Sequence, residues 1–119
     1  MKQYHSKFLV AIATVFSLAS FQASAADANN GKALVEKNNC GSCHGADLKS
    51  PIAPNYPKLA GQHADYIAHA LHAYQLTNNP LVGRSNAIMG AQAKVLSATD
   101  IKDIAAYIES LPSTLIMKK

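Results

Sequence analysis

The stretch Cys40-Gly41-Ser42-Cys43-His44 contains the only two cysteines of the 119-residue chain, and a histidine directly follows the second one. This C-x-x-C-H spacing is the attachment signature of a c-type haem. Two thiols three positions apart can reach the two vinyl groups on one edge of a porphyrin and form thioethers. The adjacent histidine can then coordinate the iron. The sequence therefore predicts one covalently attached haem c, held by Cys40 and Cys43 and ligated by His44.

The N-terminus has the three parts of a secretory signal peptide. Lys2 and Lys7 give it a positive start, residues 8–21 are mostly apolar, and Ala23-Ser24-Ala25 matches the A-x-A cleavage pattern. The apolar run is shorter than the roughly 20 residues that a membrane-spanning helix needs. We therefore expect a signal peptide over residues 1–25, cleaved after Ala25, and a single periplasmic domain over residues 26–119. An uncleaved membrane anchor is the alternative.

The charge pattern argues against a nucleic-acid binder, and the composition predicts a small hydrophobic core. The formal net charge is +4, but Lys2 and Lys7 belong to the predicted signal peptide. No basic stripe with interleaved aromatic residues follows it. The three phenylalanines also lie in the signal peptide, and the chain has no tryptophan. Because a domain of this size is marginal on its own, we expect a bound apolar macrocycle to complete the core and stabilise the folded state.

Helical periodicity and turn residues predict an all-α domain with two long loops, and no segment shows the sustained alternation of a strand. One face of the second helix is expected to carry Tyr66, Ile67, Ala70, Leu71 and Tyr74. The expected elements are a helix over 31–37 capped by Asp27 or Asn29, a loop over 45–61, a helix over 63–76, a loop over 77–90, a short helix over 91–96, and a last helix that a capping box opens at Ser97 and Pro112 ends.

Met89 is the predicted sixth ligand of the iron. A six-coordinate haem needs a ligand on its far face, and a methionine thioether is a common one that raises the reduction potential. Only Met89 and Met117 follow the signal peptide, and Met117 lies near the C-terminus, where chains tend to fray. Met89 lies in the second predicted loop, just before a helix that can fix it. An ordinary core methionine is the competing interpretation.

Three histidines on the second predicted helix leave an alternative open. His63, His69 and His72 lie there, and His69 and His72 are three residues apart. This spacing could bind zinc or copper, or supply a second histidine to a haem. Solvent-exposed residues are the more common outcome on such a helix.

Taken in order, the motifs resemble a class I bacterial cytochrome c, close to the cytochrome c4 and c553 group. The resemblance covers nearly all of residues 26–119. It is carried by Gly31-Lys32-Ala33, the haem motif, Pro57-Lys58-Leu59-Ala60-Gly61-Gln62, Met89-Gly90, and the stretch from Leu96-Ser97 to Ala106-Tyr107-Ile108. Cytochromes c4 carry two haems in two such halves. This chain has one motif and therefore resembles a single-haem relative, which implies the small class I fold of helices and two loops wrapped around one haem.

The resemblance also implies roles for individual residues. Cys40 and Cys43 would hold the haem, and His44 and Met89 would ligate the iron. Pro57 matches the family proline whose carbonyl accepts the N–H of the proximal imidazole, with Pro54 as the weaker candidate. Gly31 and Tyr107 match a close contact between the first and last helices.

The function that follows is one-electron transfer by a periplasmic carrier, not an enzyme, because filled axial positions leave no open site for substrate. The resemblance implies a quinol:cytochrome c oxidoreductase as donor and a terminal oxidase or reductase as acceptor. One alternative is a haem enzyme or ligand sensor with an open sixth position. Another is a thiol–disulfide protein that uses Cys40 and Cys43 as a redox pair, although the βαβ pattern of thioredoxin-like domains is missing.

Overall fold

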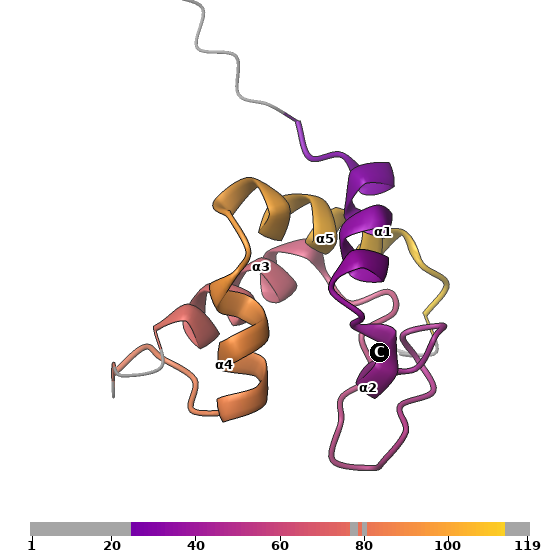
Figure 1. Ribbon diagram of the computed structural model, residues 1–119. Coiled ribbons are helices and arrows are strands. Elements are labelled where there is room, and N and C mark those ends of the chain that lie inside the picture. The colour runs from indigo at the N-terminus through magenta and orange to yellow at the C-terminus, as the bar shows by residue number, and fades with distance from the viewer. Residues whose placement is uncertain (1–24, 77–78, 80, 114–119) are drawn as a thin grey trace, which may run out of the picture.

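The computed structural model describes residues 25–76, 79 and 81–113, and these form helices joined by loops (Figure 1). No strand occurs within those ranges, so the predicted all-α class is confirmed. The predicted signal peptide, apart from Ala25, and Met117 lie outside the described residues. The helices are α1 (Ala28–Lys37), α2 (Gly41–His44), α3 (Ala64–Gln75), α4 (Ala87–Lys94) and α5 (Ala98–Ser110).

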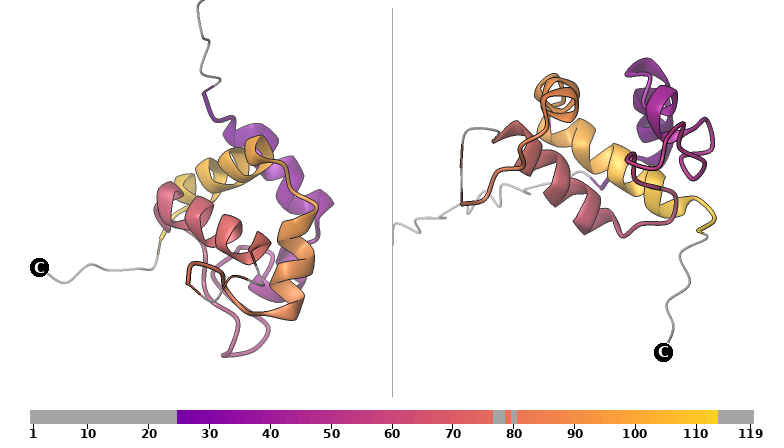
Figure 2. Two further views of the ribbon diagram at one scale, coloured as in Figure 1. Left: turned by 90° about the vertical axis from the view of Figure 1, so that its left-hand side faces the viewer. Right: turned by 90° about the horizontal axis from the view of Figure 1, so that it is seen from below.

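The arrangement places α1 and α4 toward opposite ends of a central pair of helices. Figure 2 shows α3 and α5 side by side, with α1 and α2 toward one end of the pair and α4 toward the other. α5 packs against both α1 and α3, and α4 packs against α3. The haem motif and Met89 therefore belong to different ends of the molecule and approach each other across the space between.

Both ends of α1 are capped: hydrogen bonds from flanking residues satisfy N–H groups at its start and carbonyl groups at its end. The Asp27 carboxylate accepts hydrogen bonds from the backbone N–H groups of Asn29 and Asn30, which confirms Asp27 as the cap. At the other end Asn39 adopts a left-handed conformation with φ 54°, which asparagine tolerates well. The Asn39 and Cys40 N–H groups donate to the carbonyls of Glu36 and Val35, 3.0 and 3.1 Å away. This paired C-terminal cap turns the chain from α1 directly into α2.

α1 crosses α5 at Gly31, and the crossing brings two backbones together. A methyl group added at Gly31 would overlap the carbonyl oxygen of Asp103 and come within 2.9 Å of the Cβ of Tyr107. The contact expected between Gly31 and Tyr107 is present, with the Asp103 backbone closer still. The Asp103 side chain, only 4% exposed, accepts 2.8 Å hydrogen bonds from the Asp27 N–H and the Asn30 side-chain amide. This buried carboxylate fixes the start of α1 on α5.

α5 is the helix that the sequence describes best. Ser97 and Asp100 form the predicted capping box, in which each side chain accepts the backbone N–H of the other residue. Its buried face carries isoleucine and alanine, as expected, and Asp103 in addition. Alanine and isoleucine make up most of the core. Its buried apolar members are Val35, Leu48, Ala60, Ile67, Ala70, Ala73, Ala93, Ile101, Ile104, Ala105 and Ile108.

The predicted boundary between the second loop and the following helix was wrong. The loop was expected to run to Gly90 and the helix over 91–96, but α4 starts at Ala87 and ends at Lys94. Asn86 supplies the missing signal, because its side chain caps the helix by accepting the Met89 N–H at 2.9 Å. Met89 therefore lies in the first turn of a helix and not in a loop. Of this loop, residues 77–78 and 80 lie outside the described ranges.

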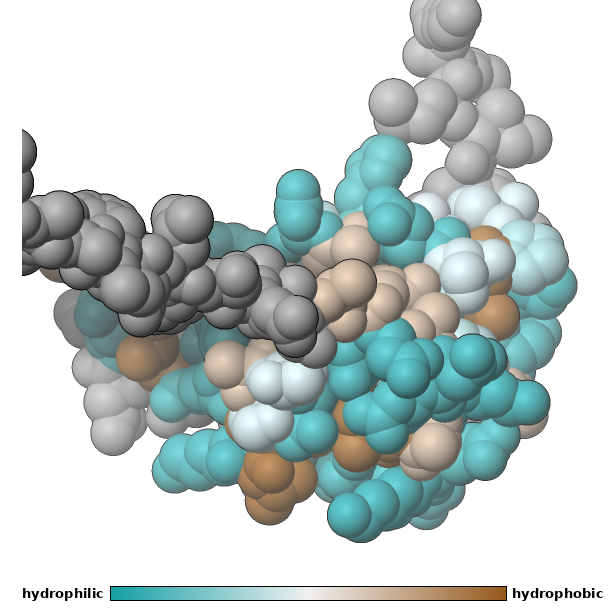
Figure 3. Space-filling view, turned by 90° about the horizontal axis from the view of Figure 1, so that it is seen from above, coloured by the Kyte–Doolittle hydropathy of each residue, from teal (hydrophilic) through white to brown (hydrophobic). Residues whose placement is uncertain are grey.

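One face of the molecule is mostly polar. Viewed from above, hydrophobic residues form small, separate patches among hydrophilic ones (Figure 3). Isolated apolar residues of this kind are normal on protein surfaces. Among the described residues, every helix is too short or too polar to cross a bilayer.

The Gly31 crossing yields the first prediction. Gly31→Ala should lower the free energy of unfolding by about 1–3 kcal/mol, the usual cost of forcing extra volume into a packed contact. Denaturant unfolding of the haem-loaded protein measures this. The exposed neighbour provides a control, and Lys32→Ala should change stability by less than about 0.5 kcal/mol. Equal effects of the two substitutions would contradict the close contact.

Candidate functional site

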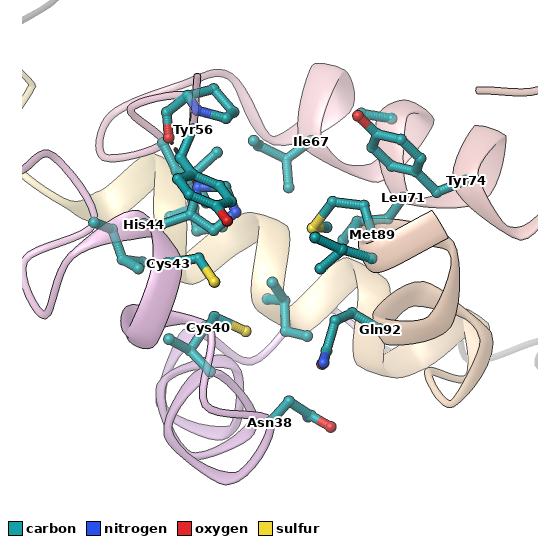
Figure 4. Close-up of a pocket in the computed structure, with 18 of the residues that line it drawn as sticks. Asn38, Cys40, Cys43, His44, Tyr56, Ile67, Leu71, Tyr74, Met89 and Gln92 are labelled. Atoms are coloured by element: carbon teal, nitrogen blue, oxygen red, sulfur yellow. Dashed lines mark hydrogen bonds between the residues drawn. The ribbon is translucent and has the colours of Figure 1, made fainter. Parts of the chain in front are cut away.

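A cavity of about 360 Å³ lies between the two ends of the molecule. Its walls come from the end of α1, from α2, from the loop after α2, and from α3, α4 and α5. Cys40, Cys43 and His44 lie on one side of it, and Met89 lies on the other (Figure 4). The structure thus brings the four predicted haem-binding residues to a single cavity, although Met89 is 45 residues from His44 in the sequence.

His44 is held in one orientation by the loop that follows α2. Its side chain is only 5% exposed, and its Nδ1 lies 2.8 Å from the carbonyl oxygen of Pro57. Because a carbonyl can only accept, Nδ1 carries a proton, and in the neutral imidazole Nε2 then keeps its lone pair. Tyr56 makes an edge-to-face contact with the imidazole, with ring centroids 6.3 Å apart. Pro57, and not Pro54, is the proline that contacts this histidine.

The loop over 45–61 reaches back to His44 because Leu48 anchors it. Leu48 is buried and has φ 54°, an unusual conformation for a leucine, and its carbonyl accepts the N–H groups of both Leu59 and Ala60. Gly45 allows the sharp turn out of α2 with φ 86°, since a side chain there would overlap the Ser50 backbone. These contacts fold the predicted loop back on itself, so that the Pro57 carbonyl lies next to the His44 imidazole.

The two cysteines point their sulfur atoms into the cavity from α2 and from the residue before it (Figure 4). Both are free thiols and partly buried. Burial raises the pKa of the Cys40 thiol above its ordinary value. The first cysteine of a redox C-x-x-C pair normally has a lowered thiol pKa, which makes it nucleophilic. The raised pKa of Cys40 and the helical fold both argue against the thiol–disulfide alternative.

Met89 faces the cavity from the first turn of α4. Its sulfur atom points from α4 toward the side of the cavity that carries His44 (Figure 4). Asn86 fixes the start of this turn through the Met89 N–H. At the other end of α4, the Gln75 amide of α3 donates to the carbonyls of Ala93 and Leu96, at 2.9 and 2.8 Å. Asn86 therefore fixes the first turn of this helix locally, and Gln75 ties its C-terminal end to α3.

Arg84 links the segment that leads to α4 with helix α3. Its backbone N–H donates to the Ala73 carbonyl at 2.9 Å. Its guanidinium lies 5.5 Å from the ring centroids of both Tyr66 and Tyr74, a cation–π arrangement. Hydrogen bonds to the hydroxyls of Tyr66 and Tyr74 raise the pKa of Arg84 above its ordinary value. All three residues line the cavity.

The other histidines take no part in this cavity. His63, His69 and His72 are exposed and absent from its lining. His63 lies 3.6 Å from the Glu109 carboxylate, and His72 contacts the Gln75 side chain. The part of the chain that the structure describes contains no group of three or more His, Cys, Asp or Glu residues arranged to hold a metal ion.

The residues present fit a covalently bound haem. Two thiols, a histidine with a free Nε2 and a thioether all face a cavity whose remaining walls are largely apolar. Sequence reasoning did not identify Tyr56, Gln75, Arg84 and Asn86 as parts of this site. Of these, only Asn86 carried a local signal, because an asparagine before a run of helix-forming residues is a typical cap.

The chain is similar in sequence to known proteins over most of its length. The sequence model of the cytochrome c family matches residues 28–112. The chain is 38% identical to cytochrome c4 of Stutzerimonas stutzeri over 109 residues, which cover 88% of this chain and 50% of the relative. It is 42% identical to cytochrome c-554(548) of Halomonas halodenitrificans over 71 residues, which cover 60% of this chain and 82% of the relative.

A solved structure is similar as well. The crystal structure of reduced recombinant cytochrome c4 from Pseudomonas stutzeri superposes with a TM-score of 0.65 at 38% sequence identity, covering 74% of this chain and 47% of that one. The chain therefore spans about half the length of the cytochrome c4 proteins that it matches.

The cap of α4 yields the second prediction. Asn86→Ala should lower the free energy of unfolding by about 1 kcal/mol, because the Met89 N–H loses its acceptor. Asn86→Asp should retain most of the stability, since a carboxylate caps equally well. Denaturant unfolding compares the two with Ser85→Ala, a substitution at the exposed neighbour. The assignment of the cap fails if Asn86→Ala is no less stable than Ser85→Ala.

Proposed function

Because the chain belongs to the cytochrome c family, we propose that it is a one-electron carrier with a single haem c, ligated by His44 and Met89. The observation that carries this proposal is the placement of the His44 imidazole and the Met89 sulfur on opposite sides of one cavity that also receives the Cys40 and Cys43 sulfurs (Figure 4). When bound, the haem iron supplies one-electron oxidation and reduction.

Each residue of the site has a distinct task in this proposal. Cys40 and Cys43 form the two thioethers that hold the group. The Nε2 atom of His44 ligates the iron, while the hydrogen bond from Nδ1 to Pro57 fixes the ring and makes the imidazole a stronger donor. Met89 fills the sixth position with a thioether, which raises the reduction potential. Two fixed ligands keep the coordination nearly unchanged between oxidation states, which favours fast transfer and leaves no position for a substrate.

The location and partners of the carrier are part of the proposal. Residues 1–25 act as a signal peptide cleaved after Ala25, so that the domain over 26–119 operates in the periplasm. Electrons arrive from a quinol:cytochrome c oxidoreductase and leave to a terminal oxidase or reductase. Encounters between redox proteins generally use small interfaces, and the small, separate apolar patches of Figure 3 are compatible with brief docking.

Covalent attachment is the third prediction. Haem should remain with the polypeptide after denaturation and acid–acetone extraction, and the mass should equal residues 26–119 plus one haem. Cys43→Ala should abolish most of the holoprotein, because one thioether cannot hold the ring beside His44. Ser42→Ala, within the same motif, should retain full attachment. Haem that moves into the organic layer from the unsubstituted protein would refute attachment, and a mass that includes residues 1–25 would refute cleavage alone.

The sixth ligand is the fourth prediction. Met89→Ala should lower the reduction potential by on the order of 0.1 V, a fraction of the roughly 0.8 V range that axial ligands set. It should also let carbon monoxide bind readily to the reduced protein. Absorption spectroscopy and redox titration measure both effects. Met117→Ala is the control and should change neither. If the unsubstituted protein already binds carbon monoxide rapidly, the sensor or enzyme alternative replaces the carrier.

A further inference from the structure

Gln75 is the only side chain of α3 for which the described part of the structure records hydrogen bonds to the far end of α4. Its Nε2 donates to the Ala93 carbonyl at 2.9 Å and to the Leu96 carbonyl at 2.8 Å. These partners are 18 and 21 residues away in the sequence. Ala93 lies in the last turn of α4 and Leu96 lies just beyond its end. The Ala93 carbonyl also accepts the Leu96 N–H at 3.1 Å, and Gln75 adds a side-chain donor at this helix end, where acceptors outnumber backbone donors.

The Gln75 amide is fully used in this position. Both of its N–H groups donate to α4, so its Oε1 must point the other way, where it lies 3.2 Å from Nδ1 of His72. An amide oxygen can only accept, and His72 therefore donates to it. With all of these groups engaged, the amide has one orientation, and it holds α4 at a fixed position on α3.

α4 depends on such hydrogen bonds from another helix more than α1 and α5 do. It has only 8 residues, and a helix this short is marginal without tertiary contacts. Its buried residues are Gly90 and Ala93, which bury little apolar area. α1 and α5, in contrast, hold each other through the Gly31 crossing and the Asp103 hydrogen bonds.

We propose that Gln75 is a positioning residue for Met89: by tethering the C-terminal end of α4 to α3, it keeps the thioether facing His44 across the cavity. This inference rests on the proposed role of Met89 as the axial ligand. Loss of the tether leaves α4 held on α3 by its weak packing and by the hydrogen bond from the Arg84 N–H to the Ala73 carbonyl ahead of its start, so that α4 swings away more often and Met89 leaves the sixth position with it.

The test measures how fast imidazole replaces Met89 in the ferric holoprotein, since imidazole can enter only when the sixth position opens. Gln75→Met removes both donors while keeping an unbranched side chain of similar length. It should raise the replacement rate about tenfold, as expected for the loss of two hydrogen bonds of ordinary strength. Gln75→Lys should restore a rate near that of the unsubstituted protein, because one ammonium nitrogen offers three donors and its charge suits the C-terminal carbonyls.

A matched control separates positioning from general stability. Ile101→Val removes one methyl group from a fully buried core position that is absent from the cavity lining. It should lower the midpoint of unfolding without raising the replacement rate. Hydrogen exchange of the α4 amides should accelerate in Gln75→Met and stay unchanged in Ile101→Val.

The outcomes distinguish this inference from the proposed function. An unchanged replacement rate in Gln75→Met, or a rise that Ile101→Val reproduces at equal loss of stability, overturns the role of Gln75 alone. Failure of Gln75→Lys to slow the rate relative to Gln75→Met overturns the hydrogen-bond explanation. A ferric protein that lacks a sulfur ligand before any substitution overturns the proposed ligation, and the inference falls with it.

Discussion

The rest of this structure depends on one constraint: the chain cannot fill its own interior. Among the described residues, five of the eleven buried apolar ones are alanines, and the largest fully buried side chains are one leucine and one isoleucine. The helices therefore enclose a cavity of about 360 Å³ in place of a continuous core. A covalently held macrocycle supplies the apolar volume that the side chains lack. Because the macrocycle is packed against these side chains only in the folded arrangement, its burial stabilises that arrangement.

The end of the molecule that carries His44 is held by more contacts than the end that carries Met89. His44 lies in a segment fixed by the paired cap at Asn39, the buried Leu48 and the Pro57 carbonyl. Met89 lies on a short helix with little buried area, whose first turn is capped by Asn86 and whose C-terminal end is tied to α3 by Gln75. With Met89 as the proposed sixth ligand, we expect the methionine side to open more readily than the histidine side, at a rate that depends on hydrogen bonds away from the ligand itself.

Much of this arrangement could be read from the sequence, because its signals are local. The haem motif, the capping box at Ser97 and the apolar face of α5 each lie within a few residues, and the resemblance to the cytochrome c family supplied Pro57 and Gly31. The predicted start of the helix, residue 91, was too late in the sequence. Gly90 is typical of a loop, and the capping signal of Asn86 did not enter the prediction. Asp103 and Gln75 carried no local signal. Their partners are 73 to 76 and 18 to 21 residues away, so only the tertiary fold reveals their roles.

α5 connects the two ends, because it packs against both α1 and α3. On one side Asp103 fixes the start of α1, Gly31 sets how closely the two helices cross, and the cap after α1 delivers Cys40. On its other side α5 packs on α3, and Gln75 of α3 secures α4. The separation between His44 and Met89 is thus set by two series of contacts that share α5. We expect a change that widens the Gly31 crossing to shift the histidine side, and a change at Gln75 to release the methionine side while the crossing stays intact.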